Sequence, residues 1–172
     1  MSQPHTTSES KEGQAYELYS LYRAWSSSCP DHFYTNNFDE WENAINNLGY
    51  KGEGITGKIP KNYIPDTTPF YRLYSASATD HFYTANKAEM ENAFQNLGYT
   101  PEGTVGYIYT CQIKGTNPLY RLYSSYATDH FYTLSESESK SAQGTGYAYE
   151  GIAGYIYPSD YSACEVTVDL GE

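Results

Sequence analysis

The pentapeptide Asp31-His32-Phe33-Tyr34-Thr35 occurs again, unchanged, at residues 80–84 and 129–133. The three copies begin at Asp31, Asp80 and Asp129, an even spacing of 49 residues. An identical segment at a fixed period of this size indicates a repeat architecture. The chain is therefore a triplicated unit, and any site that one unit carries is expected three times.

The repetition extends on both sides of the pentapeptide. A Tyr-Arg pair precedes each copy, and an aromatic residue follows two positions after the arginine. Downstream, a glutamate stays in register, and each unit closes with Glu-Gly. These positions are Arg23, Arg72 and Arg121; Trp25, Tyr74 and Tyr123; Glu40, Glu89 and Glu138; and Glu53-Gly54, Glu102-Gly103 and Glu150-Gly151. A glycine after each of the last glutamates predicts a backbone position with positive φ.

The second copy predicts the structure of one unit. Residues 70–75 and 80–84 are rich in strand-forming residues and flank a short polar turn, which indicates a hairpin. Asn86 is a candidate N-cap, with Glu89 reaching back to it as in a capping box. Met90, Ala93, Phe94 and Leu97 follow at helical spacing, so they predict one apolar helix face. Residues 99–109 then read as an extended segment interrupted by glycine.

These elements predict an α+β, β-rich fold. It consists of three tandem repeats of about 49 residues, each strand–strand–helix–strand, packed with pseudo-threefold symmetry because one unit cannot bury its own apolar face. A β-trefoil-like arrangement is the alternative. The predicted organisation is a disordered arm (1–15) and a single domain (16–172) with repeats 16–64, 65–113 and 114–158 and a closing strand at 164–169.

The composition narrows the classes of partner. Tyrosine accounts for 21 of the 172 residues while aliphatic residues are few, so we expect a tyrosine-rich core whose hydroxyls find partners. The net charge of −11 disfavours nucleic acid and anionic membrane surfaces. No segment is long enough for membrane insertion by a transmembrane helix. Residues 1–15 lack the apolar stretch of a signal peptide, so we expect a cytoplasmic protein.

Metal and redox chemistry receive little support. Cys29, Cys111 and Cys164 occupy non-equivalent positions without a CxxC spacing, so we expect free thiols; a Cys111–Cys164 bridge is the alternative. Three histidines at equivalent positions could form a zinc site. The favoured interpretation is structural, with each histidine hydrogen-bonded to a neighbouring strand or turn, and we expect neither a metal nor another cofactor.

Each copy carries an Asp-His dipeptide, a pair used in general base catalysis. Adjacent strand residues point to opposite faces, however, so the two cannot form a relay with each other. No serine or cysteine repeats in a nucleophile context, and the sequence therefore disfavours an enzyme. The arginines Arg23, Arg72 and Arg121 are predicted to pair with Asp31, Asp80 and Asp129 inside each hairpin.

The repeated aromatic and polar residues favour sugar binding. A sugar has an apolar face and a rim of hydroxyls, so its site needs an aromatic platform and a few fixed polar groups. The candidate ligand-binding residues are Trp25, His32, Tyr74, His81, Glu102, Tyr123, His130 and Glu150. We therefore predict a multivalent lectin that binds glycans of cell surfaces or cell walls. The alternatives are a protein-interaction or inhibitor module, and a hydrolase with a single site at the repeat junction.

The pattern YRLYS…DHFYT…LGY…EG…GYIY resembles a tyrosine-rich repeat of unknown function found in bacterial and fungal proteins, often beside the catalytic domains of secreted hydrolases. The resemblance covers about residues 16–158. It implies no catalytic residues, and by analogy it suggests an accessory role in binding glycans. The architecture of a free-standing triple repeat is also similar to that of the cytosolic lectins of mushrooms.

Overall fold

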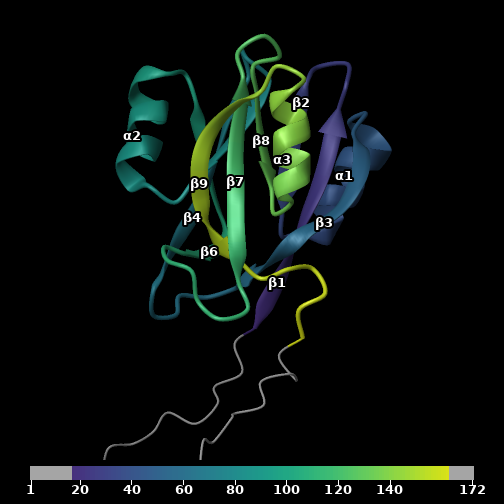
Figure 1. Cartoon of the computed structure of the whole chain (residues 1–172). Helices are drawn as coiled ribbons and strands as arrows, with labels where there is room; N and C mark the ends of the chain where they lie inside the picture. The colour runs from purple at the N-terminus through teal and green to yellow at the C-terminus, as the bar shows by residue number, and fades with distance from the viewer. Residues whose placement is uncertain (1–16, 163–172) are drawn as a thin grey trace, which may run out of the picture.

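The computed structural model describes residues 17–162, and these contain nine strands and three helices (Figure 1). The order strand–strand–helix–strand occurs three times along the chain. The first set is β1 (Leu18–Ser26), β2 (Asp31–Thr35), α1 (Phe38–Asn47) and β3 (Lys51–Pro60). The second is β4 (Thr67–Ser75), β5 (Asp80–Thr84), α2 (Lys87–Asn96) and β6 (Thr100–Tyr109). The third is β7 (Asn117–Ser124), β8 (Asp129–Thr133), α3 (Glu136–Gln143) and β9 (Ala148–Ile156).

The strands form two antiparallel sheets with the orders β2-β1-β3 and β5-β4-β6-β9-β7-β8. A bridge between Lys58 and Tyr157, with backbone hydrogen bonds of 2.8 and 3.0 Å, connects the first sheet to the chain after β9. The strands curl as a half-barrel, and the helices lie on the outside, with α1 and α2 on opposite sides in Figure 1. The fold is therefore β-rich with helices, as the sequence predicts.

Three sequence predictions fall outside the described residues. They are the N-terminal arm, the closing strand at 164–169 and the pairing of Cys111 with Cys164. Cys29 and Cys111 are exposed. Within residues 17–162, no helix has the length and apolar character needed to cross a membrane.

The predicted hairpin of the second repeat is confirmed, and its register places the site residues. Tyr74 lies opposite His81, Ser75 opposite Asp80 and Arg72 opposite Tyr83. The following strand, β6, bends where its pairing with β4 shifts between Tyr71 and Leu73. Gly103 lies at this shift with φ +93°, a conformation that glycine adopts without steric cost.

The caps of α2 also match the sequence in part. The backbone N–H of Glu89 donates to the Asn86 side chain at 3.2 Å, and Gly98 follows the helix with φ +77°. The reciprocal half of the predicted capping box is wrong. The backbone N–H of Asn86 donates to Thr84 Oγ1, and the Glu89 carboxylate instead binds Arg121.

The predicted apolar face of α2 is only partly buried. Ala93 is buried against Leu73 and Phe82 and Met90 packs beside it, but Phe94 and Leu97 are 54% and 59% exposed. The sequence pattern therefore overstates how much of this face reaches the core, because Ala93 and Met90 make the contact with the core cluster while Phe94 and Leu97 remain exposed.

A ring of three tyrosines lies at the centre of the core. Tyr34, Tyr83 and Tyr132 are almost fully buried, and each pair of rings meets edge to face at 5.3–5.4 Å. Their hydroxyls donate in a cycle, from Tyr34 to the carbonyl of Tyr132, from Tyr132 to that of Tyr83, and from Tyr83 to that of Tyr34. The predicted tyrosine-rich core with satisfied hydroxyls is confirmed.

Candidate functional site

Each predicted aromatic residue lies against its predicted histidine across a hairpin. The ring centroids are 4.5 Å apart for Tyr74 and His81. The corresponding distances are 4.3 Å for Trp25–His32 and 4.5 Å for Tyr123–His130. These pairs form because the tight four-residue turn fixes the strand register. The structure thus brings together six of the eight candidate residues as three similar pairs.

The histidines are held by aspartates of the preceding repeat. His81 Nδ1 lies 2.6 Å from Asp31 Oδ2, and the His81 backbone N–H donates to Asp31 Oδ1 at 2.8 Å. The Tyr50 hydroxyl donates to the same carboxylate at 2.5 Å. Asp80 binds His130 and Tyr99 in the same way, and Asp129 binds His32 and Tyr147. The Asp-His relay is therefore formed between repeats.

The predicted Arg–Asp ion pairs inside each hairpin are wrong. In the second hairpin, Asp80 is opposite Ser75 and Arg72 is opposite Tyr83, so the two charged side chains are three rungs apart. Arg72 instead binds both oxygens of Glu40, from the preceding repeat, at 2.7 and 3.0 Å. Its guanidinium also lies 5.3 Å over the Phe33 ring. Each arginine therefore joins two repeats.

A second glutamate from the same repeat completes each cluster. Glu102 lies 3.0 Å from Arg72 Nε and 3.3 Å from His81 Nε2. Glu150 occupies the same place beside Arg121 and His130, at 3.1 and 3.5 Å. Glu53 does so beside Arg23 and His32, at 3.1 and 3.7 Å. The two predicted glutamates thus join their predicted histidines, and Glu53 is the equivalent residue that the candidate set omits.

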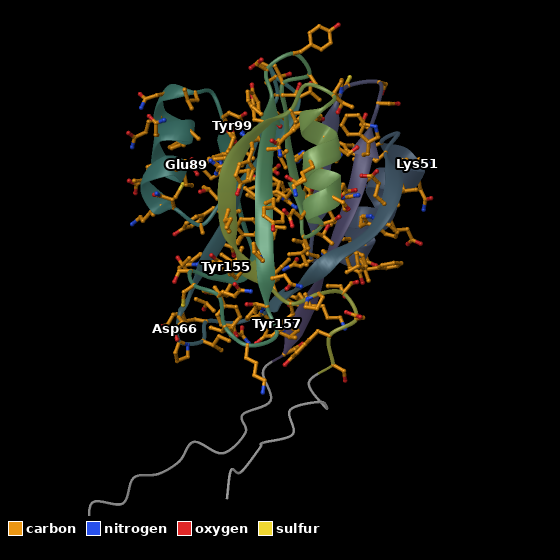
Figure 2. All side chains as sticks on the ribbon, viewed as in Figure 1. Lys51, Asp66, Glu89, Tyr99, Tyr155 and Tyr157 are labelled. Atoms are coloured by element: carbon orange, nitrogen blue, oxygen red, sulfur yellow. The ribbon has the colours of Figure 1, made fainter. Side chains whose placement is uncertain are left out.

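Sequence reasoning also missed the glutamates and tyrosines that complete the network. Glu40, Glu89 and Glu138 repeat in register, as do Tyr50, Tyr99 and Tyr147, but nothing local shows their partners. Glu89 on α2 binds Arg121 on β7 through both carboxylate oxygens, at 2.7 and 2.9 Å. Figure 2 labels Glu89 and Tyr99 between α2 and the central strands. In-register repetition of a charged residue is the one signal that could have pointed to them.

The network shifts the pKa of its members. Burial alone would lower the pKa of His81, but its hydrogen bonds to Asp31 and Glu102 outweigh burial and raise it to about 9. Burial would likewise lower the pKa of His130, but hydrogen bonds to the equivalent groups Asp80 and Glu150 raise it. The hydrogen bond from His81 lowers the pKa of Glu102 against the effect of burial. At neutral pH, His81 is therefore a cation held between two carboxylates.

The free energy of unfolding is expected to fall as the pH rises above neutrality. The pKa of His81 rises from 6.5 to about 9 on folding. Its contribution is therefore complete below about pH 6.5 and disappears as the pH rises through about 9, a loss of about 3 kcal/mol at about 1.4 kcal/mol per pKa unit. His130 adds a loss of the same sign. Urea unfolding followed by circular dichroism at several pH values across this window measures the change.

Glu102→Gln is the matched control for this pH dependence. It keeps the Asp31–His81 contact and removes one of the charges that raise the pKa of His81, so the fall in stability should become shallower. A free energy of unfolding that stays constant or increases across the same window would contradict the assignment of a protonated His81.

The three buried aspartates come close together, with carboxylate oxygens within 4.8 Å of one another. Each carboxylate already accepts hydrogen bonds from a histidine side chain, a backbone N–H and a tyrosine hydroxyl. The histidines, for their part, direct Nδ1 to an aspartate and Nε2 towards a glutamate. The alternative of a shared three-histidine zinc site is therefore wrong for the described residues, because both nitrogens of each ring face carboxylates.

A pocket of about 220 Å³ opens beside the cluster at the junction of the first and second repeats. Its wall combines the rings of Phe33 and Tyr50 with the charged groups of Arg72, His81 and Glu102. Asn43 of α1 and Leu48, which follows that helix, also line it. Apolar and polar groups of two repeats thus meet in one concave surface, which includes His81, the ring partner of Tyr74.

The comparisons with known proteins place the chain in one family. Residues 20–157 match the family described as a domain of unknown function, DUF5648, and the chain belongs to this family. No curated protein and no solved structure matches the chain.

Proposed function

We propose that the protein is a multivalent carbohydrate-binding protein, a lectin without catalytic activity, with its three repeats related by a pseudo-threefold axis. One observation carries the proposal: a set made of an aromatic ring, a histidine, a glutamate and an arginine occurs three times with similar spacing. The ring–histidine distances span 4.3–4.5 Å and the histidine–glutamate distances 3.3–3.7 Å.

The chemistry of each set suits a sugar. Trp25, Tyr74 and Tyr123 are half-buried and supported from below by the histidine rings, so each can offer a fixed face to the C–H side of a sugar. The adjoining glutamates are partly exposed and can accept hydrogen bonds from hydroxyls. The histidines are only 12% exposed, so their role is to hold the platform and the carboxylate in place.

The state of the histidines argues against catalysis. A general base must be free to take a proton near neutral pH. His81 is a cation at that pH, and both of its ring nitrogens face carboxylates. Three equal sites favour avidity instead: a surface that engages two or three of them binds more tightly than any single site by ~10²-fold or more.

Removal of one platform should weaken one site of three. Tyr74→Ala removes the half-buried ring while leaving His81 between its carboxylates. The affinity of that site for a glycan should fall about tenfold, equivalent to ~1.4 kcal/mol. Titration calorimetry with a glycan identified on an array should then report one site fewer than for the wild type.

Tyr63→Ala is the matched control, because Tyr63 is an exposed tyrosine of the segment between β3 and β4 that contacts only Tyr107 among the described rings. It should leave binding unchanged. A blank glycan array at high protein density, or equal binding by Tyr74→Ala and wild type, would overturn the proposal. A single protein captured by the wild type with no glycan bound would point to the interaction module instead.

A further inference from the structure

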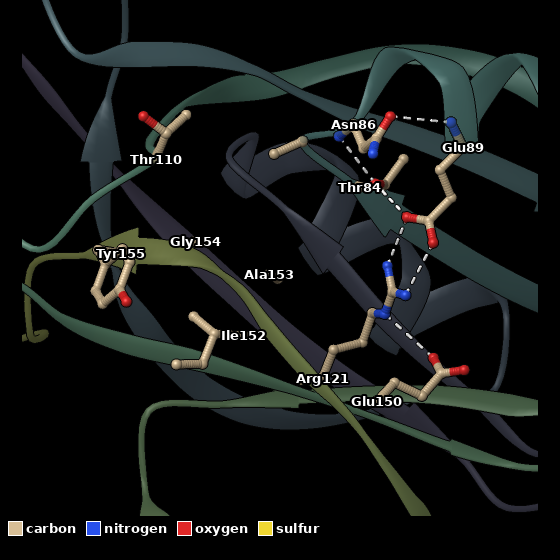
Figure 3. A pocket seen from close by; sticks show the side chains of 12 residues that line it. Thr84, Asn86, Glu89, Thr110, Arg121, Glu150, Ile152, Ala153, Gly154 and Tyr155 are labelled. Atoms are coloured by element: carbon tan, nitrogen blue, oxygen red, sulfur yellow. Dashed lines mark hydrogen bonds and ion pairs between the residues drawn. The ribbon is translucent and has the colours of Figure 1, made fainter.

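A larger cavity, of about 530 Å³, lies at the junction of the second and third repeats (Figure 3). It is bounded by β9 on one side and by the end of β5 and the start of α2 on the other. It shares Glu150 with the third repeated set but is lined by neither Tyr123 nor His130. Its volume falls within the range of about 300–1,000 Å³ that is typical of small-molecule sites.

Two small residues keep this cavity open. Ala85 and Ala153 lie in its wall, one from each repeat. At the junction of the first and second repeats, Asn36 takes the position of Ala85 and its side-chain amide donates to the carbonyl of Val105 at 3.0 Å. Asparagine thus spans the gap that alanine is too short to cross.

The junction of the third and first repeats is filled by a different side chain. Leu134 takes the position of Ala85 there and packs against the core. Its Cδ1 lies 3.1 Å from where a Cβ would stand on Gly57. The chain therefore carries three different residues at one repeated position, asparagine, alanine and leucine, and alanine, the smallest of them, stands at the junction that holds the larger cavity.

The lining offers hydrogen-bonding groups without a free cation. Arg121 is engaged by both oxygens of Glu89 and by Glu150 Oε1. Glu150 meets both of its ionic partners through Oε1, so its Oε2 is available to accept from a ligand. The Asn86 side chain uses its oxygen to cap α2, and its amide nitrogen is a donor on the α2 side of the cavity.

The opposite wall is apolar. Ile152, 46% exposed, and the ring of Tyr155 extend from β9 towards the cavity, beside Ala153 (Figure 3). A wall of this kind can cover the C–H face of a sugar ring while the carboxylate and amide receive its hydroxyls. Two carboxylates against one guanidinium disfavour an anionic ligand.

We propose that this cavity is a separate binding site for one neutral saccharide of one or two rings. The inference rests on the proposed function only for its choice of a saccharide as the ligand. The existence of the cavity is argued independently, from the small residues Ala85 and Ala153. The protein then has three similar repeated sites and a single additional one in the larger cavity, so its four sites are not equivalent.

Ala85→Leu and Ala85→Asn test the site with side chains that the fold already accommodates at the equivalent positions. Each is made in a background of Trp25→Ala, Tyr74→Ala and Tyr123→Ala, which removes the three repeated aromatic platforms, and is compared with that background carrying Ala85. Saturation-transfer NMR is recorded with glucose, galactose, mannose, N-acetylglucosamine, lactose and cellobiose, and with glucuronic acid as the anionic probe. The background should still bind at least one neutral probe, and either substitution at Ala85 should lower that affinity at least tenfold.

The outcomes separate this site from the three repeated ones. If the background binds no neutral probe, if it binds glucuronic acid as well as glucose, or if both Ala85 variants bind like it, the cavity site does not exist as proposed. If the background and the wild type bind an array of glycans equally, the three repeated sites fail while the cavity stands. The circular dichroism spectrum of each Ala85 variant is compared with that of the wild type. Only a variant whose spectrum matches is used to decide the test.

Discussion

Asp31→Asn is expected to lower the free energy of unfolding by about 3–5 kcal/mol, the cost of breaking a buried ion pair by removing one partner. Asp31 is fully buried and accepts from the His81 side chain, the His81 backbone and the Tyr50 hydroxyl. An asparagine amide nitrogen cannot accept hydrogen bonds, whereas Asp31 Oδ2 is the partner of both the His81 ring and the Tyr50 hydroxyl. The substitution also leaves the buried His81 cation without its negative partner. Urea unfolding at a pH near 6, where His81 is protonated, measures the full effect.

Asp66→Asn is the control for this change. Asp66 is exposed and has φ +67°, a conformation that asparagine tolerates equally well. The same chemical change should therefore alter stability by less than about 0.5 kcal/mol. Asp80→Asn should match Asp31→Asn, because Asp80 makes the same three contacts with His130 and Tyr99. A small loss at both buried positions would mean that the histidines are not held as cations.

The hairpins and helix caps could be predicted because they depend on neighbours in sequence. The pentapeptide with its polar turn defines a strand pair whose register follows from the turn length, and Asn86 caps the helix that begins one residue later. Such local signals are complete within one repeat. The burial of the apolar face of α2 could not be predicted in the same way. Periodicity identifies an apolar side of a helix but does not show how much protein surface is available to cover it.

The charged contacts could not be predicted because they cross between repeats. Arg72 and Asp80 lie close in sequence, so pairing them is the natural local expectation, yet Arg72 meets Glu40 and Asp80 meets His130. In a triplicated chain, every unsatisfied group has an identical alternative partner in the next unit. Sequence spacing favours the partner in the same unit, and only the packing of whole units selects the partner in the neighbouring one. The aromatic–histidine pairs were found because each lies within a single hairpin.

Tyr83→Phe is expected to cost about 3 kcal/mol, since it removes one hydroxyl that satisfies two buried backbone groups and each lost partner costs about 1–3 kcal/mol. The Tyr83 hydroxyl accepts from the N–H of Tyr34 and donates to its carbonyl, both at 2.7 Å. These groups lie on the edge of β2 that does not pair with β1. Phenylalanine preserves the edge-to-face ring contacts, so the change isolates the hydroxyl. The melting temperature should fall by about 6–12 °C for a protein of this size.

Tyr63→Phe is the control, because that hydroxyl belongs to an exposed side chain and its loss should be close to neutral. Equal melting temperatures for the two variants would show that the backbone of Tyr34 finds other partners. The cycle also allows an internal comparison. The Tyr34 hydroxyl serves the backbone of Tyr132, and the Tyr132 hydroxyl serves that of Tyr83. If the three repeats are related by a pseudo-threefold axis, the three single Tyr→Phe changes should cost similar amounts. Unequal costs would locate the junction where the repeats depart from that relation, and the junction opened by Ala85 and Ala153 is where we expect any difference to appear.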